Sequence, residues 1–235
     1  TLFVIAGIHG RELITNEVAA SFVDLLLTRD GLDPDVTWLL DHHVIYVLIT
    51  ANPDGHIKNE PGWPWAYWRK NTNPTYGCSG GSYGVDLNRN SSFEWQPQAS
   101  DVWTSTCADT YPGPAARSES ETEAIEAFAR TIFPDQRAPD LWAPAPDDAT
   151  GVFITLHSYS NLVLWPWSHT DEEAPNDAQL ARLGGNLASF NGYLPQQGSD
   201  LYPAAGTTDG YTYGELGIAS YTFEIGSSFY PSCSR

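Results

Sequence analysis

The amino-acid sequence predicts an α/β protein, a three-layer α/β/α arrangement with a mixed, largely parallel twisted sheet. Three observations favour this class: apolar strand-like runs alternate with amphipathic segments, the runs lack the alternation of half-exposed strands, and 235 residues suffice for a large core. Apolar residues make up 41% of the chain and charged residues 17%, which is typical of a globular protein. No window approaches about 18 consecutive apolar residues, so no transmembrane helix is predicted.

Four apolar runs are predicted to be buried strands, and three of them carry or lead into an ionisable residue. The runs cover residues 1–8, 43–50, 151–157 and 218–226. His9 follows the first run, His157 ends the third, and Glu224 lies among apolar neighbours in the fourth. Ligands of open α/β sheets bind outside the carboxyl ends of the strands, so we expect these side chains to converge there.

Three segments are predicted to be helices. They cover residues 15–28, 118–133 and 176–190. Thr15 is a candidate N-cap of the first helix, and Ser118 with Glu121 matches the capping-box pattern at the start of the second. Residues 51–117 begin with the turn-like "ANPDG" and are rich in Gly, Pro, Asn and Ser. Loops this long in a compact domain are usually functional.

The charge and the cysteine content of the chain bear on which partners the protein can bind and on where it is located. The chain has 11 basic and 29 acidic residues and a formal net charge of −18, which repels nucleic acid and anionic membranes and attracts cationic substrates. Three cysteines allow one disulfide and leave one thiol over. The chain contains no methionine and opens inside a predicted strand, so we expect any signal peptide to lie upstream of residue 1.

The ionisable residues at the strand ends match the ligands of catalytic zinc. Zinc in hydrolases commonly has two His and one Glu as ligands and a water in the fourth position. His9 and Glu12 are close enough in sequence to share one ion, and His157 would supply the third ligand from another strand. The helical pattern H-E-x-x-H is absent, which excludes a thermolysin-type metalloprotease.

Six short motifs in one order resemble the zinc carboxypeptidases of the carboxypeptidase A type. The motifs are "GIHGRE", "NPDG", "WRKN", "GVDLNRN", "LHSYSNLVLWPW" and "LYPAAGTTDGYTYGELGIASYTFEIG". The resemblance covers nearly the whole chain. It implies a zinc peptidase that hydrolyses the last peptide bond of a peptide or protein with a free C-terminus.

The resemblance also implies roles for individual residues. One Zn²⁺ would be held by His9, Glu12 and His157, and Glu224 would be the general base that takes a proton from the zinc-bound water. Arg69 would stabilise the oxyanion of the tetrahedral intermediate. Asp86 would accept a hydrogen bond from the nitrogen of His9 that faces away from the metal.

Substrate-binding roles follow from the same motifs. Asn88 and Arg89 would bind the terminal carboxylate, which a planar guanidinium fits in a bidentate manner, and Tyr202 would close over the bound C-terminus. Arg11 would contact the substrate further along the cleft. Asp209 would read the terminal side chain, and its acidity suggests acceptance of Lys and Arg alongside apolar residues.

The resemblance bears on the disulfide, the location and the extent of the domain. Cys78 and Cys107 would form a disulfide, as in some relatives, which implies an oxidising compartment and a secreted protein. Cys233 is left over. We expect residues 1–235 to be one catalytic domain that lacks the strands usually found before the first metal motif and the helix usually found after the catalytic glutamate.

Two other functions fit parts of this pattern. One is a peptidoglycan stem-peptide hydrolase of the same fold, and the other is a non-catalytic, zinc-containing binding module. The carboxylate-binding pair Asn88 and Arg89, together with Tyr202, favours an exopeptidase over a cell-wall hydrolase. A binding module would most readily have lost Glu224 or a metal ligand, and this chain keeps them all. The oligomeric state is not predicted.

Overall fold

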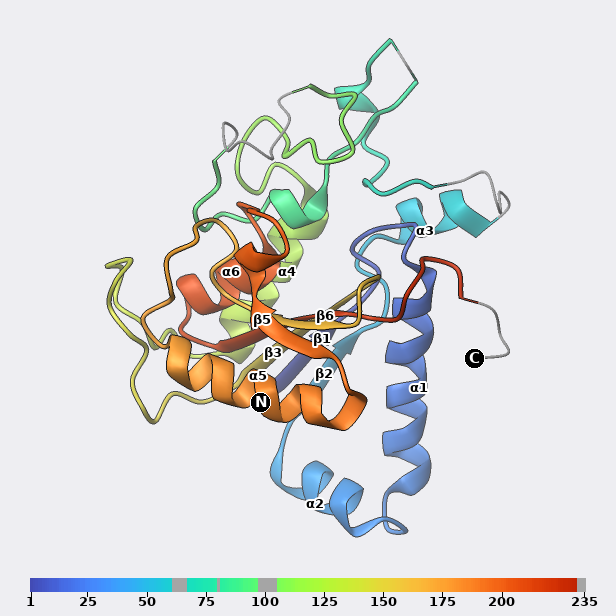
Figure 1. Ribbon diagram of the computed structural model, residues 1–235. Coiled ribbons are helices and arrows are strands. Elements are labelled where there is room, and N and C mark those ends of the chain that lie inside the picture. The colour runs from blue at the N-terminus through green and yellow to red at the C-terminus, as the bar shows by residue number, and fades with distance from the viewer. Residues whose placement is uncertain (61–66, 80, 97–104, 232–235) are drawn as a thin grey trace.

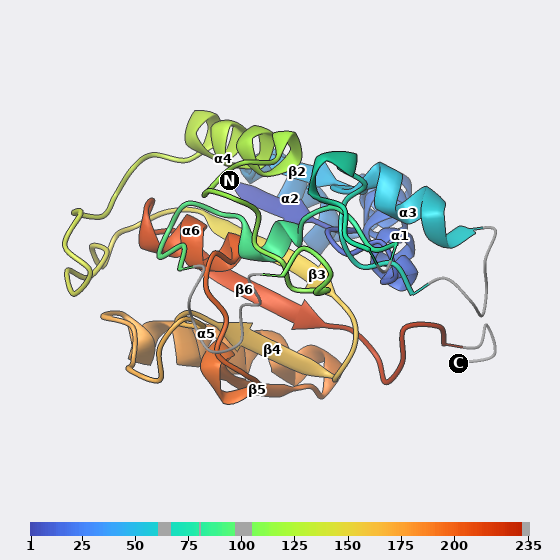
Figure 2. The same cartoon turned by 90° about the horizontal axis from the view of Figure 1, so that it is seen from above.

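A six-stranded sheet forms the centre of the molecule (Figure 1). The computed structural model describes residues 1–60, 67–79, 81–96 and 105–231. The strands are β1 (Leu2–Ile5), β2 (Ile45–Leu48), β3 (Val152–His157), β4 (Leu162–Trp165), β5 (Leu194–Gln197) and β6 (Ala219–Glu224). Their spatial order is β2-β1-β3-β6-β4-β5, which Figure 2 shows nearly face on. Among the strand pairings of the described residues only β4–β6 is antiparallel, so the predicted mixed, largely parallel sheet is confirmed.

Helices cover both faces of this sheet. They are α1 (Leu13–Arg29), α2 (Pro34–His42), α3 (Pro53–Asn59), α4 (Ser120–Ile132), α5 (Asp177–Asn191) and α6 (Thr208–Gly214), with short 3₁₀ turns at Pro74–Tyr76 (η2), Leu87–Arg89 (η3) and Gly198–Asp200 (η4). On one face, Phe3 and Phe153 pack in a cluster with residues of α4 and α6. On the other, Val4 and Leu156 pack with Ala19 of α1, and Tyr221 packs with residues of α5.

The predicted elements lie within a few residues of the observed ones, but both helix-cap predictions were wrong. α1 begins at Leu13, and Thr15 Oγ1 donates to the Glu12 carbonyl instead of capping the helix. α4 begins at Ser120, so Glu119 is the N-cap residue, and the Ser118 hydroxyl donates to the Glu119 carboxylate. In both cases the hydroxyl donates to a nearby acceptor of the residue that precedes the helix, instead of accepting from a backbone amide of the first helical turn.

Several elements were not predicted. The "NPDG" turn begins helix α3, in which Asn52 caps the Gly55 amide at 2.9 Å. The strands β4 and β5 and the helices α2 and α6 are only four to nine residues long, too short for a clear apolar period. No helix in the described part of the chain is long and apolar enough to span a membrane.

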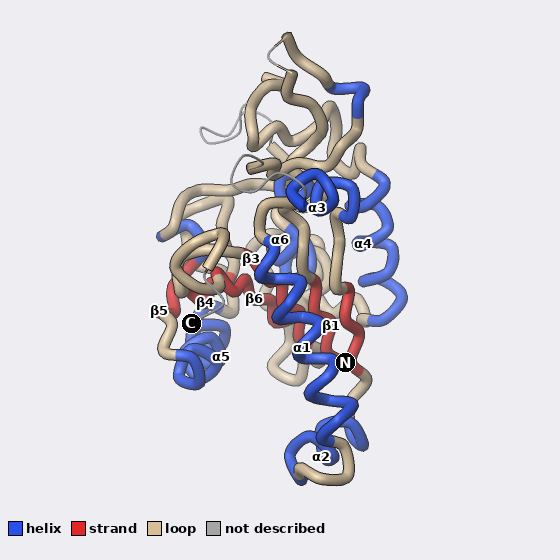
Figure 3. Tube along the Cα trace, turned by 90° about the vertical axis from the view of Figure 1, so that its right-hand side faces the viewer, coloured by secondary structure: helices blue, strands red, loops and turns tan. Residues whose placement is uncertain are grey.

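Irregular segments gather at one end of the molecule, above the strands in the view of Figure 3. They include the stretch from Tyr67 to Arg117, which the structure describes apart from residue 80 and residues 97–104. Parallel strands β1, β3 and β6 all run in the same direction, so the residues that follow them share one edge of the sheet. The candidate site lies there.

Candidate active site

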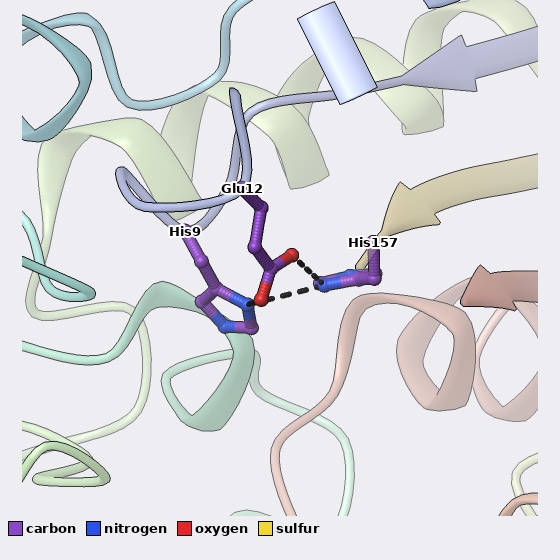
Figure 4. A group of neighbouring side chains, drawn as sticks. All are labelled: His9, Glu12 and His157. Atoms are coloured by element: carbon purple, nitrogen blue, oxygen red, sulfur yellow. Dashed lines mark hydrogen bonds and ion pairs between the residues drawn. The ribbon is translucent and has the colours of Figure 1, made fainter. Parts of the chain in front are cut away.

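His9, Glu12 and His157 converge on one point at the carboxyl edge of the sheet (Figure 4). His9 lies in the turn after β1, Glu12 directly precedes α1, and His157 is the last residue of β3. His9 Nδ1 is 2.8 Å from Glu12 Oε1, and His157 Nδ1 is 3.1 Å from both His9 Nδ1 and Glu12 Oε2. All three side chains are buried.

The path of the chain around His9 depends on a glycine. A Cβ atom on Gly10 would lie 2.3 Å from the carbonyl oxygen of Gly55 and 2.9 Å from that of Trp68. The backbone amide of Gly10 donates to the carbonyl of Arg69 at 3.0 Å. The turn that carries His9 is therefore packed directly against the backbone of helix α3 and of the loop that contains Trp68, and a side chain at position 10 would push it away.

Both histidine rings also have a hydrogen-bond partner at Nε2, the ring nitrogen that faces away from the shared point. Asp86 Oδ1 lies 3.1 Å from His9 Nε2, and Thr155 Oγ1 lies 3.0 Å from His157 Nε2. If each Nε2 carries the proton, the lone pair of each Nδ1 faces the shared point. Acceptors behind metal-bound histidines fix the tautomer and the ring direction in this way.

The electrostatics of these groups favour a cation. Burial lowers the pKa of His9, with a further contribution from the Arg69 charge. Burial would raise the pKa of Glu12, but the charge of His9 and the hydrogen bonds from both histidines outweigh it and hold the pKa below its usual value. Burial opposes protonation of His157, yet its hydrogen bond to Glu12 raises its pKa. Two imidazole nitrogens and one carboxylate oxygen form a donor set that fits zinc.

Asp86 connects the histidine to a buried arginine. Its Oδ2 accepts from Arg69 Nε at 2.9 Å and lies 2.8 Å from Arg69 Nη2, while its Oδ1 accepts from the Asn88 amide at 3.0 Å. Burial would raise the pKa of Asp86, but the Arg69 charge holds it well below its usual range. Arg69 Nη1 lies 4.0 Å from Glu12 Oε1, which places the guanidinium beside the ligand set.

Asn88 and Arg89 lie in the η3 turn. The backbone amide and the hydroxyl of Thr208 both donate to Asn88 Oδ1, at 3.0 and 3.2 Å, which leaves the Asn88 amide nitrogen to act as a donor. Arg89 Nη1 donates to the Asn88 carbonyl at 2.8 Å, and its buried Nε has no partner among the described residues. The Arg89 guanidinium lies 5.6 Å from the ring of Tyr202, which is 44% exposed.

Glu224 ends β6 beside His157, with which it is in register. Burial and the charge of Glu12 raise the pKa of Glu224 to about 7. A carboxyl group with a pKa near neutrality can both take up and release a proton.

Most of the residues described above line one cavity of about 290 Å³. Its described lining residues are His9, Arg11, Glu12, Arg69, Asn88, His157, Ser158, Tyr159, Ser160, Leu201, Tyr202, Glu224 and Phe229. A larger hollow of about 630 Å³ lies between β2 and α4, and its lining is mainly apolar. Of these two, the smaller cavity is lined by the candidate metal ligands.

Other predicted residues lie around or outside this cavity. Arg11 forms an ion pair with Asp109 at 3.1 Å, and its guanidinium lies 4.8 Å from the Phe229 ring. Asp209 is buried in the first turn of α6, and neither it nor Arg89 is among the described residues that line the cavity.

The predicted disulfide is present. Cys78 and Cys107 are joined, with Cα atoms 5.4 Å apart. Cys233 lies outside the described residues.

Two threonines of the site were not predicted. Thr155 lies two positions before His157 on β3, so both point to the same face of the sheet, and this spacing was a usable signal. Thr208 is 120 residues from Asn88, and no local pattern connects them.

This α/β fold, with a buried His–Glu–His set at the carboxyl edge of its sheet, is the architecture of a metalloenzyme. The sequence matches the profile of the zinc carboxypeptidase family over residues 1–232, and the chain belongs to that family. Its members use zinc, and among the described residues His9, Glu12 and His157 form a group that could hold the ion.

Individual relatives agree with this assignment. Zinc carboxypeptidase A 1 of Anopheles gambiae is 32% identical over 95% of this chain and 48% of its own length. Carboxypeptidase B of Homo sapiens is 32% identical over 95% of this chain and 51% of its own length. The crystal structure of thrombin activatable fibrinolysis inhibitor superposes with a TM-score of 0.77 at 26% identity, over 96% of this chain and 54% of that one. The chain thus spans about half the length of the curated relatives it matches.

Proposed function

We propose that this protein is a zinc-dependent carboxypeptidase that removes single residues from the free C-termini of peptides and proteins. The observation that carries the proposal is the convergence of His9, Glu12 and His157 on a cavity that Glu224 also lines. Zinc held by the three ligands supplies Lewis-acid chemistry, which polarises a peptide carbonyl and makes water more acidic.

Glu224 is the proposed general base. Its carboxylate takes a proton from the attacking water and passes it to the nitrogen of the departing residue, so that one peptide bond breaks and one water is consumed. The raised pKa of Glu224 supports this role, because the protonated form can act as the acid in the second step. The guanidinium of Arg69, buried beside the ligands, donates to the oxyanion that forms when water attacks.

Asn88, Arg89 and Tyr202 are the proposed recognition elements for the substrate's C-terminus. The Asn88 amide nitrogen is free to donate because Thr208 holds the amide oxygen. The buried Nε of Arg89, which has no partner among the described residues, supports a role in binding an anion. The exposed ring of Tyr202 lies at the rim, where it can cover a bound terminus. A site for a free carboxylate favours an exopeptidase over a peptidoglycan hydrolase.

The Cys78–Cys107 disulfide supports an extracellular location, since disulfides persist mainly in oxidising compartments. We also propose that residues 1–235 work as one catalytic unit.

The proposal is tested with a matched pair of peptides that differ only in the C-terminal group, one a free carboxylate and the other an amide. The zinc-loaded protein should release the last residue of the first peptide and leave the second intact. Glu224→Gln should lower kcat by about 10²–10⁴-fold, because the amide cannot accept the water's proton, while zinc content stays unchanged. Equal cleavage of both peptides, or a Gln variant that retains its activity, would refute the proposal.

A further inference from the structure

The segment Gly84–Ser91 carries Asp86, Asn88 and Arg89, yet it is almost entirely irregular. Every residue in it is buried, and only the three-residue turn η3 gives it regular structure. Buried backbone without helix or strand partners must find its hydrogen bonds elsewhere. The groups that supply them determine where the three functional side chains lie.

Asn71 holds the beginning of this segment. Its backbone amide donates to the Val85 carbonyl at 3.0 Å, and its side-chain oxygen accepts from the Val85 amide at 2.8 Å. The side-chain nitrogen of Asn71 donates to Glu119 Oε2 at 2.7 Å, and that of Asn73 donates to the same oxygen at 2.9 Å. Glu119 thereby fixes the orientation of the amide that pairs with Val85.

Asn90 holds the end of the segment and also contacts Glu119. Its side-chain oxygen accepts from the Glu119 backbone amide at 3.2 Å, and its side-chain nitrogen lies 3.0 Å from the hydroxyl of Ser118. That hydroxyl donates to Glu119 Oε1 at 2.8 Å. Glu119 is 2% exposed, and the three donors that reach its oxygens are neutral amides and a hydroxyl.

We propose that Glu119 is a positioning residue for the active site, which acts through Asn71 and Asn90 on the two ends of the segment that carries Asp86, Asn88 and Arg89. A carboxylate suits this place because its Oε2 accepts from two amide groups while its Oε1 accepts from the Ser118 hydroxyl. Leucine offers no acceptor to any of these donors, whereas glutamine can turn its amide oxygen toward Asn71 and Asn73 and donate from its NH₂ group to the Ser118 hydroxyl. This inference rests on the proposed function and adds a residue that touches neither substrate nor metal.

Glu119→Leu should therefore loosen the segment, whereas Glu119→Gln, which keeps an acceptor for Asn71 and Asn73, should not. Displaced Asn88 and Arg89 would bind the substrate's carboxylate less well, so KM should rise, and kcat/KM should fall by about 10-fold or more. A loss of folded protein alone would lower the apparent kcat and leave KM unchanged. Glu123→Leu is the matched control, because Glu123 lies in the first turn of α4, close to Glu119 in sequence, is 54% exposed and carries the same charge.

Hydrogen exchange of the peptide that covers residues 84–93 provides a readout that does not depend on activity. Exchange there should be faster in Glu119→Leu than in the wild type and the control, at a temperature where thermal melting shows all three folded. Glu119→Gln should keep slow exchange and most of the kcat/KM, because its amide oxygen can still accept from Asn71 and Asn73.

Unchanged exchange in residues 84–93 of the folded Glu119→Leu variant would overturn the inference, and so would a Glu119→Gln variant that is as impaired as Glu119→Leu. If the wild type hydrolyses no peptide, the proposed function fails, and the exchange experiment still decides whether Glu119 positions the segment.

Discussion

At the scale of single residues, the orientation of the two histidine rings of the site depends on the groups that contact their Nε2 atoms. Asp86 and Thr155 each lie within hydrogen-bond distance of an Nε2 atom, and both Nδ1 atoms consequently face Glu12. His9 follows one strand and His157 ends another, and Glu12 lies three positions after His9, which made this set predictable from the sequence. Of the two supporting residues, Asp86 was predicted only through the resemblance of its motif, because it is 77 residues from His9, and Thr155 was not predicted.

His157→Ala should reduce bound zinc from one equivalent to well below one after dialysis. It removes one of three ligands and leaves a gap in a buried site that two ligands do not close. Metal analysis of the purified protein measures this directly. His43→Ala, which changes an exposed histidine, should keep full occupancy. A His157→Ala protein that retains one zinc would contradict the ligand assignment.

Asp209→Ala should lower the preference for basic C-terminal residues. The carboxylate is buried next to Thr208, which holds Asn88, and a buried acid interacts most favourably with a cation. We expect the ratio of kcat/KM for peptides ending in Arg and in Leu to fall by about tenfold, which corresponds to about 1.4 kcal/mol. Asp148→Ala, at an exposed and distant position, is the control. An unchanged ratio would show that Asp209 does not read the side chain.

At the scale of elements, long runs were predicted well and short ones were missed. The predicted strand 151–157 corresponds to β3, and the predicted helix 176–190 corresponds to α5, within one residue at each end. The four-residue β4 gives no clear period, and its antiparallel direction depends on β6, which enters the sheet later in the chain. Local pattern therefore predicted the elements that bear the ligands better than those that complete the sheet.

The helix α4 carries a second buried acid, Glu126, whose ionisation should affect stability. Its carboxylate accepts from the amide and the hydroxyl of Ser92, at 2.7 and 2.9 Å. Burial raises the pKa of Glu126 from 4.5 to about 7. Between these values the folded protein keeps a proton that the unfolded chain has lost, so this group makes stability fall as pH rises from 4.5 to about 7.

Glu126→Gln should remove this pH dependence. The amide oxygen can accept from the Ser92 amide, the amide nitrogen can donate to its hydroxyl, and no charge is buried at any pH. Relative to the wild type, the Tm of the variant should therefore be higher at about pH 8 than at about pH 5. Thermal melts across this range, with Glu123→Gln as control, provide the comparison. A Tm difference that does not change with pH would argue against a raised pKa.

At the scale of the whole molecule, a net charge of −18 surrounds a site that contains several acidic groups. Such a field attracts basic peptides, and salt shortens the distance over which it acts. The Debye length falls from about 30 Å at 0.01 M ionic strength to about 8 Å at 0.15 M. The composition alone predicted this field. It could not predict where the acidic residues lie relative to the cavity, because that depends on the fold.

Raising the ionic strength over this range should lower kcat/KM for a peptide ending in Arg by several-fold and leave kcat nearly constant. A matched neutral peptide ending in Leu should show a smaller change, because only the charged substrate is steered. Initial rates at low substrate concentration measure both values. Equal salt dependence for the two peptides would mean that steering plays no part.

The Cys78–Cys107 disulfide also has a consequence for the protein's resistance to cleavage by proteases. The two cysteines are 29 positions apart and enclose the whole segment Gly84–Ser91. A single backbone cut between them would yield two fragments that remain one covalent molecule, with the first metal ligands on one fragment and the third on the other. Such a nicked protein would run as one band on a denaturing gel until a thiol is added, and it would keep both halves of its catalytic centre through repeated unfolding and refolding.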